Sequence, residues 1–181
     1  MSDQNTLLIV KADFAPYVQV AEYGNFDALM STHILNAQHY DIKPILGDSF
    51  YADLVINRVD ANYVTLLDGD EYTYNSKIYF FQGLKKSIVH FAYSRYAMRA
   101  GVQDTASGLV KKSNPNSEPL DLKEISKESE YHKSLGVASL NDVLTFLRRN
   151  ASTYPEYLTG DCDSSTTRPS GSARITAINN D

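Results

Sequence analysis

The residues of this 181-residue chain that could do chemistry most directly form an acidic turn of Asp68, Gly69, Asp70 and Glu71. A calcium loop needs oxygen ligands at alternating positions and a bidentate glutamate about a dozen residues from its start. The range 72–74 offers no such ligand, so we interpret the segment as a solvated turn. A hydrolase using Asp68 and Asp70 would need both carboxylates held at a set separation in a pocket. A turn rarely provides that arrangement, and an enzyme is therefore the less favoured alternative.

The remaining candidate ligands and nucleophiles are scattered along the chain. The histidines His33, His39, His90 and His132 form no HxxxH or HxH pair, so a zinc site would have to be assembled by tertiary contact alone. We expect each to be a surface or half-buried helix residue. Cys162 is the single cysteine, which excludes an intramolecular disulfide and a cysteine-based metal cluster. A catalytic nucleophile needs a held base beside it, so we expect Cys162 in its polar tail to be a bystander thiol; no GxSxG, GxxxxGK[ST] or GxGxxG motif occurs. We predict no catalytic residue, no metal ion and no cofactor.

Basic side chains mark a second possibility, a nucleic-acid-binding or regulatory interaction protein. Paired lysines on an arm can contact phosphate backbones. The net charge of −5 argues against a protein whose main task is to grip nucleic acid, and a solvated or inter-subunit face is the alternative interpretation. The residues concerned are Lys85, Lys86, Arg95, Arg99, Lys111 and Lys112.

The composition is that of a folded protein, with 43% hydrophobic and 22% charged residues. Thirteen tyrosines and no tryptophan are unusual. Tyrosine joins a large apolar ring to a polar tip and suits surfaces that are buried on association, although we expect most of these rings to be half-buried in the monomer. No apolar run reaches the length of a membrane span, so we predict no membrane partner.

Two segments carry the strongest helical patterns. The range 83–100 places apolar side chains at helical spacing, and Gly101 is a natural C-terminal stop. Asp121 and Glu124 fit a capping box that begins a second, longer helix ending near Asn150. Gly136 lies in the middle of that helix and lowers its propensity by about 1 kcal/mol relative to alanine, which predicts a bend or a break.

The first half of the chain predicts shorter elements. We expect a brief helix over 13–23 and a helix over 26–40 capped by Asn25. Pro44 interrupts that pattern because it lacks an N–H group and crowds the preceding turn. The apolar pattern then resumes to about residue 58. The range 72–81 favours a small hairpin with its turn at Asn75-Ser76.

The expected fold is mainly α: a small helical bundle with a β-hairpin or arm between helices and an extended C-terminal tail. We assign residues 1–158 to a helical domain, with the hairpin at about 72–81 and the arm at about 108–119, and residues 159–181 to the tail. The arm is rich in turn formers, and the tail is polar apart from one β-prone island at 173–178. The candidate inter-subunit residues of the arm are Leu109, Val110, Lys111 and Lys112, and the candidate partner contacts of the tail are Arg168, Arg174, Ile175 and Ile178.

The order of these elements resembles head-to-tail connector (adaptor) proteins of tailed bacteriophages. The resemblance covers about residues 26–158 and rests on "DIKPILGD" before the hairpin, "GLKK…FAYSRY" after it, and the arm GLVKKSNPNSEPL. The elaborated range 64–81 departs from the family pattern, and the hairpin there has no assigned role. Neither motif marks a catalytic site.

The resemblance implies a structural virion protein at the neck, the junction of head and tail, made in the host cytoplasm. Such proteins form a ring, commonly a homo-dodecamer, beneath the portal protein. The ring extends the DNA channel and docks the next neck or tail protein, while DNA passes through without sequence-specific binding. Matched to this chain, the arm lies at 108–119 and the segment that reaches the portal lies at 161–181. A tail of this kind can become ordered on a partner, and a heterologous contact repeated by rotation closes a ring.

Overall fold

The computed structural model describes residues 6–19, 26–100, 102–105, 108–111 and 121–159, and every structural statement below concerns these residues. The predicted mainly α fold is confirmed, and no described helix is long and apolar enough to cross a bilayer. In chain order the elements are η1 (Lys11–Phe14), α1 (Phe26–Ala37), η2 (Gln38–Ile42), α2 (Lys43–Leu46), α3 (Asp48–Ile56), α4 (Ala61–Asp68), β1 (Asp70–Tyr74), β2 (Lys77–Phe81), α5 (Gly83–Ala100), β3 (Val102–Thr105), β4 (Gly108–Lys111), α6 (Leu122–Arg149) and α7 (Pro155–Thr159).

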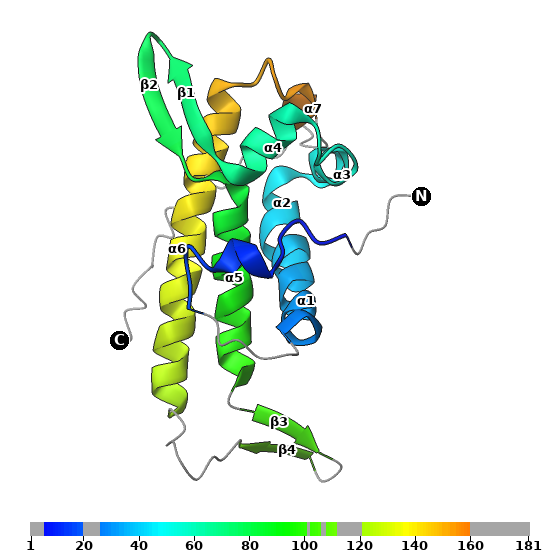
Figure 1. Cartoon of the computed structure of the whole chain (residues 1–181), viewed down its shortest axis with the longest axis vertical. Coiled ribbons are helices and arrows are strands. Elements are labelled where there is room, and N and C mark those ends of the chain that lie inside the picture. The colour runs from blue at the N-terminus through cyan, green and yellow to red at the C-terminus, as the bar shows by residue number, and fades with distance from the viewer. Residues whose placement is uncertain (1–5, 20–25, 101, 106–107, 112–120, 160–181) are drawn as a thin grey trace, which may run out of the picture.

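Helices α5 and α6 lie antiparallel along the length of the molecule, and α1 lies on the other side of α5 (Figure 1). Helix α5 is therefore the central element, and Ile88, Val89 and Ala92 on it are fully buried. Val143 and Leu147 of α6 are buried as well. Burying a side chain of this size stabilises the fold by roughly 1.5–3 kcal/mol, so this pair of helices forms the centre of the core.

The predicted start of α6 is confirmed, and the predicted break within it is wrong. The Asp121 carboxylate accepts a hydrogen bond from the Glu124 backbone N–H at 2.7 Å, and the Glu124 carboxylate accepts one from the Asp121 N–H at 3.0 Å. The helix then runs unbroken through Gly136. A Cβ atom at Gly136 would lie 2.9 Å from Cε1 of Phe91, so the glycine exists to admit the Phe91 ring and not to bend the helix.

The N-terminal elements differ from expectation. The helix predicted over 13–23 is wrong where the structure describes that range, because only the 3₁₀ turn η1 forms and a turn through Tyr17 follows it. The predicted helix over 26–40 is confirmed as α1 and the π turn that continues it, whereas its predicted cap, Asn25, lies outside the described residues. Beyond α1 the chain stays helical through Pro44, since the π turn η2 widens the helix just before the proline. The wider turn accommodates the Pro44 ring, which would otherwise clash with the carbonyl of Tyr40. It also removes the need for an i to i−4 hydrogen bond, which proline cannot donate because it lacks an N–H group.

The π turn also places a buried amide. The Gln38 side chain is fully buried; its Oε1 accepts from the Leu8 N–H at 2.9 Å and its Nε2 donates to the Thr6 carbonyl and the Tyr51 hydroxyl, both at 3.0 Å. This satisfied amide holds the N-terminal segment against the helices, because leaving any of these buried groups unpaired would cost about 1–3 kcal/mol.

The predicted hairpin is confirmed in place and turn. Strands β1 and β2 pair antiparallel with Tyr72 opposite Tyr79, and Asn75 and Ser76 have φ values of 50° and 61°. Two-residue hairpin turns of type I′ require positive φ at both positions. At the base of the hairpin Gly69 and Gly83 lie back to back, so that a Cβ on either would come within 2.6 Å of the other's backbone nitrogen.

The arm between α5 and α6 contains a β-hairpin, as predicted, but it begins earlier. Strands β3 and β4 pair antiparallel from Val102 opposite Lys111 to Thr105 opposite Gly108. This hairpin lies at the end of the molecule opposite β1–β2 (Figure 1). The rest of the predicted arm, residues 112–119, and the predicted tail beyond residue 159 lie outside the described residues, together with Cys162.

We expect Gly136→Ala to destabilise the protein by about 1–2 kcal/mol, although alanine has the higher helix propensity, because the new methyl overlaps the Phe91 ring. Urea unfolding measures the change. The matched control introduces the same alanine into a Phe91→Leu background, where the ring is gone and the substitution should become neutral or stabilising. Equal effects in both backgrounds would contradict the packing role of Gly136.

Candidate functional site

The two aspartates of the acidic turn have different partners. Helix α4 ends at Asp68, and the Asp68 carboxylate forms an ion pair with Lys85 Nζ at 2.7 Å. The same ammonium lies 3.2 Å from Asp13, so it joins the N-terminal segment, α4 and α5. Burial disfavours the charged form of Lys85, but the hydrogen bonds and charges of Asp68 and Asp13 outweigh it and raise the pKa. Asp70 instead accepts from the Glu71 backbone N–H at 2.8 Å. The turn therefore contributes a structural ion pair through Asp68, and β1 begins two residues later at Asp70.

Two of the histidines are not surface or half-buried residues, which corrects the expectation from sequence. His90 of α5 and His132 of α6 are 2% and 5% exposed, and their Nδ1 atoms are 3.1 Å apart. His132 Nε2 lies 3.2 Å from the Glu128 carboxylate. The described residues nevertheless contain no group of three or more histidine, cysteine or carboxylate side chains that could hold a metal ion.

The histidine pair has room for one proton between its facing nitrogens. At a separation of 3.1 Å one Nδ1 donates and the other accepts, so a second proton there would set two donors against each other. Burial, followed by the charges of His132 and Lys86, lowers the pKa of His90 to about 4. The rings of Tyr17 and Tyr93 pack against the pair. The two histidines thus form a buried polar contact between α5 and α6, and this contact is favoured when His90 is neutral.

The β1–β2 hairpin has one packed face and one open face. On the packed face, the rings of Tyr72 and Phe81 lie 5.1 Å and 3.9 Å from the ring of Phe146 in α6. On the open face, Ile78 and Phe80 are 63% and 77% exposed. Apolar side chains two residues apart on a strand point the same way, so the open face forms a small apolar surface.

Arg149 fastens the hairpin to the last turn of α6. Its Nη1 donates to the Tyr72 hydroxyl at 2.8 Å, and its guanidinium lies 4.2 Å from the centre of the Tyr79 ring and 5.1 Å from that of Tyr74. A cation above aromatic rings adds about 0.5–2 kcal/mol, depending on its desolvation. These contacts of Arg149 hold the open face in a set orientation relative to the helices. The sequence predicted the hairpin over 72–81, but nothing local to that range pointed to Arg149.

The residues predicted to make contacts are placed only in part. Leu109, Val110 and Lys111 lie in β4, opposite Asp104, Gln103 and Val102 of β3. This places three predicted arm residues on a β-hairpin between the two long helices. The other predicted contacts, Lys112, Arg168, Arg174, Ile175 and Ile178, lie outside the described residues.

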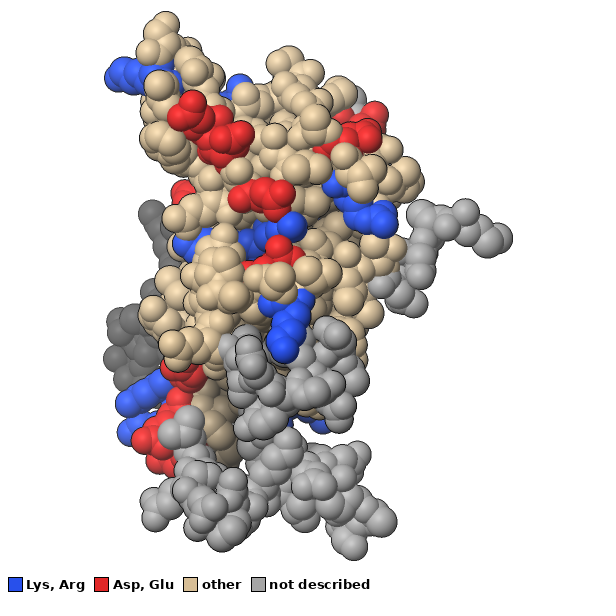
Figure 2. Space-filling model, in the orientation of Figure 1, with Lys and Arg blue, Asp and Glu red and all other residues tan. Residues whose placement is uncertain are grey.

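Charged side chains of the described residues are interleaved on the face seen in Figure 2, where lysine and arginine alternate with aspartate and glutamate. Of the basic residues singled out in the sequence, Lys85 is paired with two carboxylates and Arg95 with Asp41. A nucleic-acid interface normally gathers positive charge into one patch or stripe. This face therefore adds no support for the nucleic-acid alternative.

The histidine pair should make the protein sensitive to mild acid. Because the pKa of His90 falls from its ordinary 6.5 to about 4 in the fold, the unfolded chain takes up this proton first as pH falls. The stabilisation is complete above pH 6.5 and is lost as pH falls toward 4, by on the order of 1–2 kcal/mol at pH 5. We expect His90→Leu/His132→Leu to flatten the melting temperature between pH 7 and 5. His39→Gln is the control and should keep the acid sensitivity; an unchanged slope in the double variant would contradict this role.

Comparison with known proteins adds one result to this geometry. No curated protein and no solved structure matches the chain. Residues 42–167, which run from η2 past α7, match a family of unknown function, DUF6712. The match spans more than half of the chain and includes the helix pair, both hairpins and the buried histidines. The chain therefore belongs to the DUF6712 family of unknown function.

Proposed function

We propose that this protein is a structural subunit of the neck of a tailed bacteriophage, forming a ring between the capsid portal and the tail. In that role it extends the DNA channel and docks the next neck or tail component, and it has no catalytic role. The resemblance of residues 26–158 to head-to-tail connectors supports the proposal. The observation that carries it is a β-hairpin arm between two long antiparallel helices, with a second hairpin at the opposite end (Figure 1).

Each hairpin offers edges for association. Among the described residues, β1–β2 and β3–β4 are both sheets of two strands, so each strand has one edge that pairs with no other described strand. Backbone N–H and C=O groups on such an edge can pair with a strand of another chain. If the arm of one subunit meets a different surface of the next, repetition by rotation closes a ring. The number of twelve subunits comes from the resemblance.

The open face of β1–β2 suits contact with the neighbouring component. Ile78 and Phe80 lie outward on a hairpin that Arg149 and Phe146 hold from behind. Burying two such side chains on association would stabilise the contact by roughly 1.5–3 kcal/mol each. A ring repeats that contact in every subunit, so the overall affinity for the neighbouring component can be high although each single contact is weak. This gives the β1–β2 hairpin, to which the resemblance assigns no role, a place in the assembly.

The direct test is negative-stain imaging and mass measurement of the purified chain with and without the portal ring of its phage. We expect a ring of this chain on the portal. A monomer in isolation agrees with the proposal, since such subunits can wait for the portal before assembling. Absence of any cyclic assembly in both settings, with no binding to the portal, would overturn the proposal.

The role of the open face is tested separately with Ile78→Ser/Phe80→Ser. We expect an unchanged melting temperature, because both side chains are exposed in the monomer, and at least about a tenfold loss in the capture of the next neck or tail component by portal-bound rings. Val59→Ser is the matched control, since Val59 is also 77% exposed but lies between α3 and α4. Equal capture by the double variant and the control would remove this face from the proposal.

A further inference from the structure

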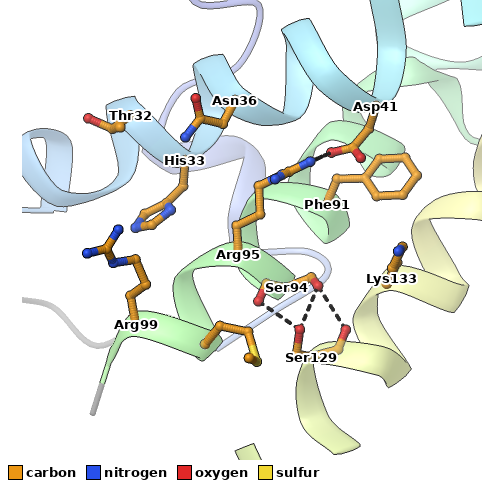
Figure 3. Close-up of a pocket in the computed structure, with 11 residues that line it drawn as sticks. Thr32, His33, Asn36, Asp41, Phe91, Ser94, Arg95, Arg99, Ser129 and Lys133 are labelled. Carbon is orange, nitrogen blue, oxygen red and sulfur yellow. Dashed lines mark hydrogen bonds and ion pairs between the residues drawn. The ribbon is translucent and has the colours of Figure 1, made fainter. Parts of the chain in front are cut away.

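A polar groove lies beside α5, between α1 on one wall and α6 on the other (Figure 3). Its volume is about 450 Å³. Neither the acidic turn, the arm nor the hairpin takes part in it. The side chains that line it come from four elements and are Thr32, His33 and Asn36 of α1, Asp41 of η2, Phe91, Ser94, Arg95, Met98 and Arg99 of α5, and Ser129 and Lys133 of α6.

The floor of the groove is fixed where α5 meets α6. The Ser94 hydroxyl donates to the Ser129 carbonyl at 2.9 Å, and the Ser129 hydroxyl donates to the Ser94 carbonyl at 3.1 Å. These reciprocal bonds hold the two helices at a short, defined separation. The α6 wall therefore keeps its distance from α5 in the free protein, and a ligand would not have to order this wall on binding.

Arg95 is held in place at the centre of the groove. Its Nε and Nη2 both donate to the same Asp41 oxygen, at 3.0 Å and 2.7 Å. These bonds use two of the five N–H groups of a guanidinium. The Asp41 side chain is 17% exposed and that of Arg95 35% exposed, so the cation remains partly open to solvent. Asp41 thus orients Arg95 while the groove keeps access to it.

The balance of charge in the groove is positive, against a chain of net charge −5. Arg95, Arg99 and Lys133 contribute three positive charges and Asp41 one negative charge, which leaves two positive charges. Figure 3 shows Arg99 beside His33 at one end and Lys133 on the α6 wall. Concentrated positive charge with hydroxyl and amide donors nearby is the arrangement that recognises oxyanions.

His33 lies in the field of the same arginines. Burial, followed by the charges of Arg99 and Arg95, lowers its pKa and so disfavours the imidazolium. Its edge packs against the ring of Tyr96, with centres 6.0 Å apart. A neutral imidazole still donates one N–H bond, and a negative ligand beside it would favour its protonation.

We propose that this groove binds an oxyanionic group, a carboxylate or a phosphate, held between Arg99 and Lys133 on opposite sides with Arg95 and Asn36 between them. The volume exceeds that of one such group and leaves room for the atoms that carry it. Two sources supply this chemistry: a free small anion, or an acidic side chain of a neighbouring polypeptide. The site belongs to the single subunit and does not depend on ring formation. Its test is therefore independent of the proposal that the protein is a subunit of the phage neck.

The test uses the purified full chain and NMR signals of the His33 ring. Sodium phosphate replaces sodium chloride at constant ionic strength in one arm, and a blocked tetraglutamate peptide, with tetraglutamine for comparison, is titrated in the other. We expect a saturable shift of the His33 signals and an upward change of its pKa, because an anion favours the imidazolium. Response to phosphate identifies a free oxyanion as sufficient; response to tetraglutamate alone identifies an acidic side chain as the ligand.

The matched variants separate this site from general charge effects. Arg99→Gln/Lys133→Gln should weaken binding by about tenfold or more, since charge-assisted hydrogen bonds from both walls are lost. Lys77→Gln/Arg148→Gln removes the same charge from exposed positions outside the groove and should bind as the parent does. No saturable shift in either arm, or equal weakening in both variants, would overturn the proposal. Circular dichroism confirms that each variant is folded.

Discussion

The close packing of α5 against α6 is the contact on which the other features of this molecule depend. Phe91 lies where a side chain at Gly136 would stand, Ser94 exchanges hydrogen bonds with Ser129, and His90 contacts His132. Most of the stability of a helix in a protein comes from packing of its amphipathic face, so α6 depends on its contact with α5 for much of its stability. The interface between α5 and α6 combines close packing with paired polar side chains. Together they restrict how the two helices can fit against each other.

Polar groups in this interface oppose sliding of one helix along the other. A shift by one turn would leave two imidazoles and two hydroxyls in the interface without partners, at about 1–3 kcal/mol for each buried group. Apolar packing alone tolerates such shifts better, because many registers bury similar area. The histidine pair and the serine pair therefore select one register, and the acid sensitivity of the pair is a consequence of placing ionisable rings there.

A fixed helix pair gives defined positions to everything attached to it. The two hairpins lie at its opposite ends (Figure 1). Arg149 on the last turn of α6 orients the β1–β2 hairpin, while Asp41 orients Arg95 in the groove beside α5. In both places an arginine is held by neighbours on another element, which makes a surface feature part of the rigid body.

The sequence by itself determined the elements that depend on neighbours in the chain. Helical spacing located α5, the capping box located the start of α6, and Asn75-Ser76 located the hairpin turn, because each signal acts within a few residues. Only the tertiary structure decided what Gly136 does, which histidines meet and where the basic groove lies. His90 and His132 are 42 residues apart in sequence, and Gly136 is explained only by a ring on another helix. Contacts of that kind arise from how the elements pack, and no local spacing of residues encodes them.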